Sequence, residues 1–233
     1  MNGPTHKTSR RATLRGFSLL EMAVVLIIVG FLLGGLLDTL GNLQARQREE
    51  QTDRQLEEIR EALITFAVVN RRLPCPAAPA TAATVAGAGM ERAPTVAGCT
   101  GGPAGVLPWA TLALPQTDAW GRRFTYRVAA TYSHSGVAIA LATLADINVR
   151  NRALVVLGSQ IPAIIVSHGA NAAGSRNTSG ALAAAGANAF EQENSDGDVD
   201  FVSDTPAGAF DDRVIWVPSS LLMSRMLQAG SLP

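Results

Sequence analysis

The chain has 233 residues, of which 47% are hydrophobic and 16% are charged, with 19 Lys and Arg against 19 Asp and Glu. This length and apolar fraction suit one modest globular domain together with an apolar helix. The balanced charge argues against nonspecific binding to DNA, which needs a basic surface to displace counterions, so we expect no nucleic acid partner.

Residues 1–16 form a short basic leader with four Lys or Arg and no Asp or Glu, and its removal would leave 15 basic against 19 acidic residues. From residue 17 to residue 37 the chain is almost wholly apolar. A helix of that length spans roughly 31 Å, which matches a bilayer hydrocarbon core. The sequence therefore predicts a transmembrane segment over 17–37, and the positive-inside rule leaves the leader in the cytoplasm.

Glu21 is the one acidic residue in this apolar segment. A carboxylate inside a membrane helix costs about 2.5 to 3.5 kcal/mol and usually has a partner. If a peptidase cut after Gly16, the new α-amino group of Phe17 would lie one helical turn from Glu21, within reach of it or of a neighbouring helix. We therefore expect Phe17 and Glu21 to form a charge pair.

The run Gly16-Phe17-Ser18-Leu19-Leu20-Glu21, between a basic leader and an apolar helix, resembles the signal of type IV pilins and type II secretion pseudopilins. The resemblance implies cleavage between Gly16 and Phe17 by prepilin peptidase and N-methylation of Phe17. It also implies that Glu21 pairs with a neighbouring subunit's terminus during assembly.

The same resemblance implies the partners and the location of the protein. The partners would be other pilin or pseudopilin subunits, the prepilin peptidase and an inner-membrane assembly platform. The chain would cross the inner membrane once, with its N-terminus cytoplasmic and its head periplasmic, before it enters a pilus or pseudopilus. The alternative is a signal-anchored exported protein with a binding or enzymatic head that is not assembled into filaments.

After residue 40 the chain becomes polar, and Leu56, Ile59, Leu63, Phe66 and Ala67 recur at three- and four-residue intervals. This spacing predicts a helical stripe that packs on a folded domain. Residues 17–70 are thus predicted to form one helix, which two nearby prolines end, and residues 71–233 are predicted to form the head. The expected fold class is α+β and pilin-like, with a long N-terminal helix, membrane-spanning in its first half, packed on a small antiparallel β-sheet.

Residues 77–106 are rich in Ala, Gly, Thr and Pro and are predicted to form a long loop. Cys75 and Cys99 are the only cysteines, and both lie in turn-like sequence on the side predicted to be exported. We predict a disulfide between them, which would stabilise the fold by about 3 kcal/mol. Two free thiols are the alternative.

Alternating and short apolar runs mark the strands of the head. We predict strands over 123–130, 136–142, 153–157, 163–166 and 213–217, and a short helix from Ser219 or Ser220 to Leu227. The stretch from Asp118 to Tyr126 resembles the Asp-Pro-Trp-Gly stretch that enters the sheet of major pseudopilins, with Ala119 in place of the proline.

An acidic stretch runs from Glu191 to Asp200 and is followed by Asp204, Asp211 and Asp212. Clustered carboxylates among turn residues suit calcium, and the resemblance adds that major pseudopilins carry a calcium-binding loop late in their heads. The candidate calcium ligands are Asp196, Asp198, Asp200 and Asp204. A solvated acidic loop without metal is the alternative.

No catalytic motif accompanies these features. His134 and His168 have serines nearby, but the chain has no G-x-S-x-G elbow, H-E-x-x-H pair or phosphate-binding loop. The sequence of residues 167–169 is more typical of a strand end and turn. We therefore expect a structural filament subunit and no enzyme, with the length and the Ala/Gly-rich insertions favouring a minor subunit.

Overall fold

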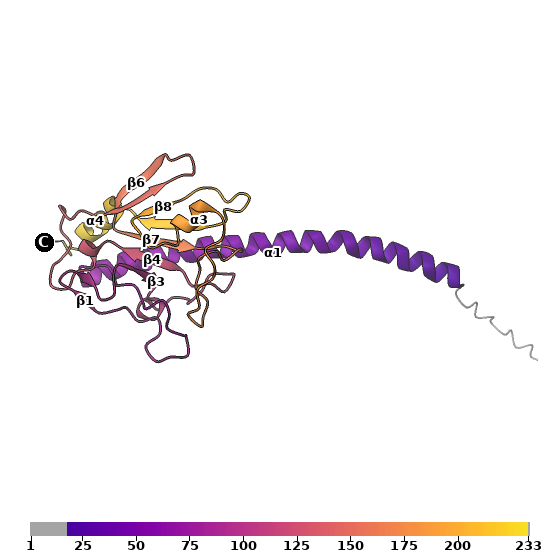
Figure 1. Cartoon of the computed structure of the whole chain (residues 1–233), viewed down its shortest axis with the longest axis horizontal. Helices are drawn as coiled ribbons and strands as arrows, with labels where there is room; N and C mark the ends of the chain where they lie inside the picture. The colour runs from indigo at the N-terminus through magenta and orange to yellow at the C-terminus, as the bar shows by residue number, and fades with distance from the viewer. Residues whose placement is uncertain (1–17, 233) are drawn as a thin grey trace, which may run out of the picture. The chain divides into compact units, whose positions relative to one another are not determined.

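The computed structural model describes residues 18–232, and the side chains of all of these except residues 32–40 and 42. Two compact units divide the chain, Met1–Arg46 and Gln47–Pro233, and we call the second unit the head. Helix α1, Leu19–Asn70, contributes to both units. The remaining elements belong to the head (Figure 1): β1 Pro94–Thr95, β2 Gly98–Cys99, β3 Ala104–Val106, α2 Trp109–Leu112, β4 Thr125–Val128, the 3-10 helix η1 Ala130–Tyr132, β5 Ile147–Arg150, β6 Val156–Ile161, β7 Ala163–Ser167, α3 Ala189–Glu193, β8 Asp200–Val202, β9 Arg213–Val217 and α4 Ser219–Gln228.

Helix α1 ends at Asn70 because the next residue leaves the helical conformation. Arg71 has a positive φ of 57°, and its N–H donates to the carbonyl of Ala67 over 2.8 Å. A left-handed residue directly after the last turn is a common helix stop, and Pro74 follows as a second barrier. The end of the helix lies where the sequence predicts it.

A four-stranded antiparallel sheet, ordered β3-β4-β7-β9, forms the middle layer of the head (Figure 1). All five residues of β7 are buried, because the sheet is covered on both faces. Ala163 and Ile165 belong to the core on the α1 side, whereas Ile164 and Val166 belong to the core on the opposite side. This alternation follows from the two-residue period of a strand.

The larger core joins α1 and α4 to this sheet. Leu56, Ile59 and Leu63 of α1 are at most 4% exposed and pack in one cluster with Tyr126 and Leu222. Burial of each such side chain contributes about 1.5 to 3 kcal/mol. The predicted apolar stripe is therefore confirmed, except that Phe66 is only half-buried, with the guanidinium of Arg72 lying 5.3 Å from its ring centroid.

A second sheet, ordered β6-β5-β8, covers the other face of the middle layer through a core that includes Ile147, Val149 and Phe201. Strands β5 and β8 pair in parallel, and β5 pairs with β6 in antiparallel. A two-stranded sheet, β1-β2, makes a third. The expected single small antiparallel sheet is therefore wrong, because the described residues form three sheets and one of them is mixed.

The predicted strands have mixed outcomes. The strands over 123–130, 163–166 and 213–217 are confirmed as β4, β7 and β9. The strand over 136–142 is wrong, since that segment starts with the positive-φ residue Gly136 and pairs with no strand among the described residues. The strand over 153–157 is misplaced, because a turn precedes β6. The predicted loop 77–106 contains β1, β2 and β3.

The predicted transmembrane segment over 17–37 is also wrong. Within the described residues, no helix combines the length and the apolarity that a membrane crossing requires. The same finding contradicts the expected single-pass location in the inner membrane, with the N-terminus cytoplasmic and the head periplasmic. It also overturns the membrane-spanning half of the expected fold class.

Candidate functional site

The start of α1 is closed by a reciprocal pair of hydrogen bonds between Ser18 and Glu21. The N–H of Glu21 donates to Ser18 Oγ over 3.2 Å, and the N–H of Ser18 donates to Glu21 Oε2 over 3.4 Å. This is a capping box, in which two helix-end N–H groups gain acceptors. The helix accordingly begins at Leu19.

The capping box gives Glu21 a role within its own helix. The sequence analysis missed this role, although the spacing Ser-x-x-Glu is typical of a capping box. A carboxylate in the first turn also interacts favourably with the helix dipole. The predicted cleavage and methylation positions, Gly16 and Phe17, lie outside the described residues, so the expected pair between Glu21 and the amine of Phe17 stays a prediction.

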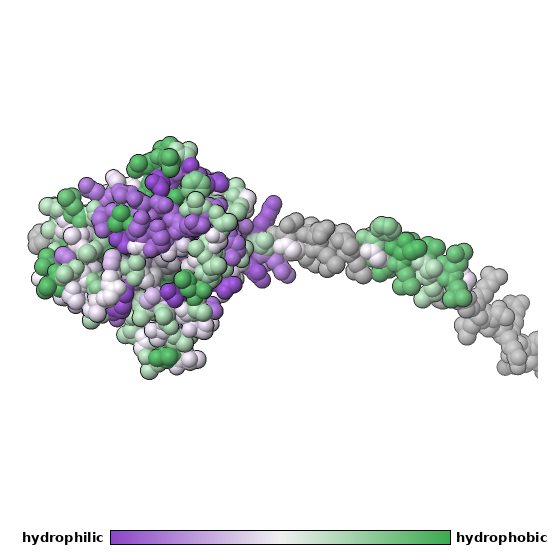
Figure 2. All heavy atoms as spheres, viewed as in Figure 1, coloured by the Kyte–Doolittle hydropathy of each residue, from purple (hydrophilic) through white to green (hydrophobic). Residues whose placement is uncertain are grey.

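Beyond Glu21 the helix carries apolar side chains all around its circumference. Ten large apolar residues between positions 19 and 31 are 42% to 93% exposed, and Figure 2 shows the start of α1 covered by hydrophobic residues. An exposed apolar surface of this extent marks an interaction site. A helix that is apolar on every side is stable only when other groups surround it.

The disulfide between Cys75 and Cys99 is confirmed, with Cα atoms 5.5 Å apart. It closes a loop that is also tied to the end of α1. The carboxylate of Glu91 accepts two hydrogen bonds from Arg72, both 2.8 Å long, and one from the N–H of Cys75 over 3.0 Å. This part of the structure is a rigid brace, and the alternative of two free thiols is excluded.

The four predicted calcium ligands do not converge. Asp196 and Asp198 are exposed, and each accepts a hydrogen bond from the N–H two residues ahead. Asp200 accepts from the Asn148 side chain, and Asp204 pairs with Arg152 over 3.2 Å. Among the described residues, no three of these carboxylates come close enough to share an ion.

The fold instead gathers Glu191, Asp211 and Asp212. One oxygen of each lies within 4.8 Å of the others, with Glu191 and Asp212 buried and Asp211 half-buried. Glu191 comes from α3, and the two aspartates directly precede β9. The sequence shows these residues as part of the acidic stretch, but only the packing of α3 beside β9 shows that they meet.

Neighbouring polar groups donate hydrogen bonds to some of the carboxylate oxygens of this cluster, but not to all of them. Glu191 Oε1 accepts from Asn171 Nδ2 over 2.8 Å and from the N–H of Asp211 over 3.0 Å, and Asp212 Oδ2 accepts from Asn194 Nδ2 over 2.8 Å. Asp211 Oδ1 and Asp212 Oδ1 are buried and accept no hydrogen bond in the described structure. Burial raises the pKa of Asp211, and the charges of Glu191 and Asp212 raise it further.

Three adjacent carboxylates suit a divalent cation, because Asp211 Oδ1 accepts no hydrogen bond from the described residues and Asp212 Oδ1 faces only the ring of His168. Calcium takes carboxylate and amide oxygens as ligands, and its charge would compensate the mutual repulsion of the three groups. Glu191, Asp211 and Asp212 therefore fit a cation better than the four residues chosen from the sequence.

His168 lies beside this cluster and is fully buried. Its Nε2 lies 2.8 Å from Thr125 Oγ1, and its Nδ1 lies 3.4 Å from Asp212 Oδ1. It follows directly after β7 and precedes the positive-φ residue Gly169, so the predicted strand end and turn are confirmed. The histidine fixes β4, β7 and the start of β9 relative to one another.

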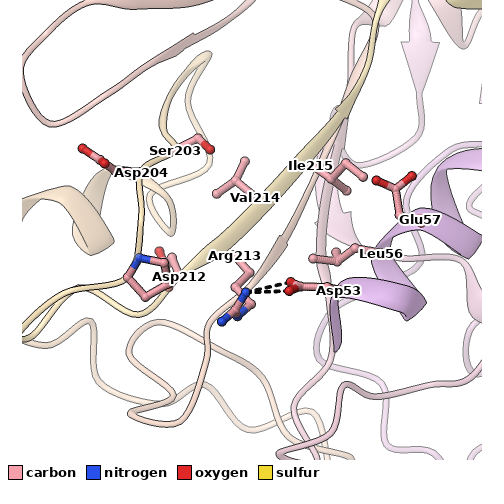
Figure 3. A pocket seen from close by; sticks show the side chains of 10 residues that line it. Asp53, Leu56, Glu57, Ser203, Asp204, Asp212, Arg213, Val214 and Ile215 are labelled. Atoms are coloured by element: carbon pink, nitrogen blue, oxygen red, sulfur yellow. Dashed lines mark hydrogen bonds and ion pairs between the residues drawn. The ribbon is translucent and has the colours of Figure 1, made fainter. Parts of the chain in front are cut away.

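A groove of about 280 Å³ lies on the same side of the head, between α1 and β9. Figure 3 shows Arg213 at its edge, donating to both carboxylate oxygens of Asp53 over 2.8 Å. Arg213 also lies 3.1 Å from Glu49. These bonds hold β9 against α1. Asp212 lines the groove and also belongs to the carboxylate cluster, so the groove and the cluster adjoin.

No protein-family model matches this chain, and neither do the curated proteins or the solved structures. The function therefore has to be argued from the residues described above.

Proposed function

We propose that the protein is a structural subunit of a pilin-type filament, processed by prepilin peptidase and assembled through the amino-terminal part of α1. The observation that carries the proposal is the apolar helix start. Ten exposed apolar side chains lie on both sides of the capping residue Glu21, and packing against copies of the same helix would bury all of them.

The role of Glu21 in this proposal is electrostatic. Its carboxylate attracts the α-amino group of a processed neighbouring chain and so sets the axial register of the packed helices. Because Glu21 also caps its own helix, an alanine variant removes both functions at once. The amide of glutamine can replace the carboxylate in a capping box, but it carries no charge.

Two variants at Glu21 separate the alternatives in a filament-assembly assay on the native host. Glu21→Ala and Glu21→Gln are both expected to lower incorporation into filaments by about tenfold, because both remove the charge. Glu58→Gln is the matched control, since Glu58 is an exposed carboxylate on the same helix. Normal incorporation of Glu21→Gln would leave the capping box as the only role of Glu21 and would refute the charge pair.

Processing is tested separately by mass spectrometry of the native N-terminus. The proposal requires a chain that starts at a methylated Phe17. A chain that retains Met1 while it enters filaments would contradict it.

A further inference from the structure

Strand β6 is an open edge of the head. In the sheet order β6-β5-β8 it pairs with β5 on one side only, and the described residues provide no strand for its other side. Its residues are exposed on both faces, since Val156, Leu157, Ser159 and Gln160 are all exposed. Figure 1 shows β6 at the top of the head, at the margin of the layered core.

The start of this strand and the turn before it form a continuous apolar surface. Leu154, Val155, Val156 and Leu157 are 65%, 56%, 67% and 46% exposed, and Figure 2 shows hydrophobic residues at this end of the head. Residues 153–161 carry no charge and no proline. Charges and prolines protect many natural sheet edges, and this edge has neither. The pairing of β6 with β5 is irregular and Gln160 has a positive φ of 53°, so the start of the strand is the part that is open to pairing.

The turn holds this surface in one conformation. The side-chain oxygen of Asn151 accepts from the N–H groups of Ala153 over 3.0 Å and Val155 over 2.9 Å. Between them Leu154 has a positive φ of 62°, a backbone conformation that is unfavourable for a leucine. The fold keeps an exposed leucine in an unfavourable conformation, which is typical of a binding position.

A hollow of about 350 Å³ adjoins the strand and is lined by residues that include Leu154, Val156 and Ser159. The nearby cations already have partners. Arg150 pairs with Glu193 over 2.6 Å, and Arg152 pairs with Asp204 over 3.2 Å. Asp200 also lines the hollow, and its carboxylate accepts a hydrogen bond from Asn148 Nδ2 over 3.1 Å. Because residues 153–161 of the edge carry no charge, the edge complements an uncharged segment.

We propose that β6 is a strand-addition site, which binds an extended, uncharged, apolar segment of a partner polypeptide. Main-chain hydrogen bonds to the open edge supply affinity, and alternate side chains of the partner contact Val156 and the hollow. A stable dimer of globular chains buries at least about 1,200 Å² in total, whereas four exposed side chains make a patch of a few hundred Å². The size of the surface thus favours a single strand over a second copy of the head.

The test uses the full-length protein and a capped, fluorescent seven-residue peptide of alternating threonine and valine, with binding followed by anisotropy. A peptide of the same sequence, N-methylated at alternate residues, is the control for main-chain bonding. We expect N-methylation and Val156→Lys each to weaken binding by about tenfold or more. Leu182→Lys, which changes a residue 61% exposed elsewhere on the head, should leave binding unchanged.

Absence of binding would overturn the proposal, as would equal affinity for the N-methylated peptide or for the Val156→Lys variant. Self-pairing is tested with Ser159→Cys, because the native chain has no free cysteine among its described residues. A disulfide-linked dimer of this variant that persists in excess peptide would assign the edge to a second copy and would also overturn the proposal. These outcomes are independent of Glu21 and of filament assembly.

Discussion

Glu191, Asp211 and Asp212 are the residues whose arrangement most needs an explanation, because three carboxylates share one partly buried site. Asp211 Oδ1 accepts no hydrogen bond from the described residues, and Asp212 Oδ1 has only His168 Nδ1 beside it, 3.4 Å away. If a cation compensates them, it binds the folded state only, and saturation at about a hundred times its dissociation constant stabilises the fold by about 2.7 kcal/mol. We therefore expect millimolar calcium chloride to raise the melting temperature by several degrees.

The matched variants distinguish this site from the acidic segment chosen from sequence. Asp212→Asn should abolish the response to calcium, and Asp198→Asn should leave it intact, since Asp198 is exposed and lies outside the cluster. Differential scanning calorimetry with and without calcium gives the answer. A response lost in Asp198→Asn alone would return the site to the sequence-chosen residues.

Asp211 also predicts how stability depends on pH when no calcium is present. Its pKa is raised in the folded state, chiefly by burial, so the folded protein binds a proton more readily than the unfolded chain does. Stability must then fall as pH rises from the ordinary aspartate pKa through the raised one. Asp211→Asn should flatten this slope in urea unfolding above about pH 4, whereas Asp196→Asn, an exposed control, should not. An unchanged slope in Asp211→Asn would contradict the assignment.

At the scale of single residues, the sequence indicated important side chains more reliably than it indicated which side chains contact one another. Cys75 and Cys99 could be paired because no other cysteine competes. The carboxylates could not be sorted, because eight of them lie from Glu191 to Asp212, mostly in loops, and sequence distance does not say which ones α3 and β9 bring together. The spacing between Ser18 and Glu21 predicts a capping box. It was missed because Glu21 was assigned only to a charge pair with the amine of a neighbouring subunit.

At the scale of elements, the brace between the end of α1 and the following loop gives the next prediction. The disulfide constrains residues that are separated by 24 positions, which the loop-entropy model values at about 3 kcal/mol. Replacing both cysteines by serine should lower the free energy of unfolding by roughly that amount, as measured by urea denaturation. Arg72 and Glu91 should still hold the loop, so the variant is expected to fold.

The elements that the sequence predicted well are those with a buried face or a continuous apolar run, such as Val214–Val217 of β9. β4, β7 and β9 lie in the middle layer, where alternation or a continuous apolar run is strong. β5 and β8 were missed because they are short, carry charged residues and depend on each other through a parallel pairing. The segment 136–142 has the composition of a strand but no partner among the described residues, and composition alone cannot supply one.

At the scale of the whole molecule, the head is a three-layer arrangement in which β7 joins two cores. Ile165 packs on the α1 side and Ile164 on the side of β5 and β8, and both are almost fully buried. Truncation of either side chain to alanine should cost about 2 to 5 kcal/mol. If the layers unfold together, Ile164→Ala and Ile165→Ala should lower the melting temperature by similar amounts, each with a single transition.

Native-state hydrogen exchange then decides whether the outer sheet is an independent unit. A cooperative head predicts that Ile164→Ala lowers protection in β4 and β9 as much as in β5 and β8, because one strand supports both cores. Selective loss of protection in β5, β6 and β8, with β4 and β9 unaffected, would show that the outer sheet opens alone. That result would place the open edge of β6 on a separately mobile layer, and it would contradict the single cooperative head that we expect from the fully buried β7.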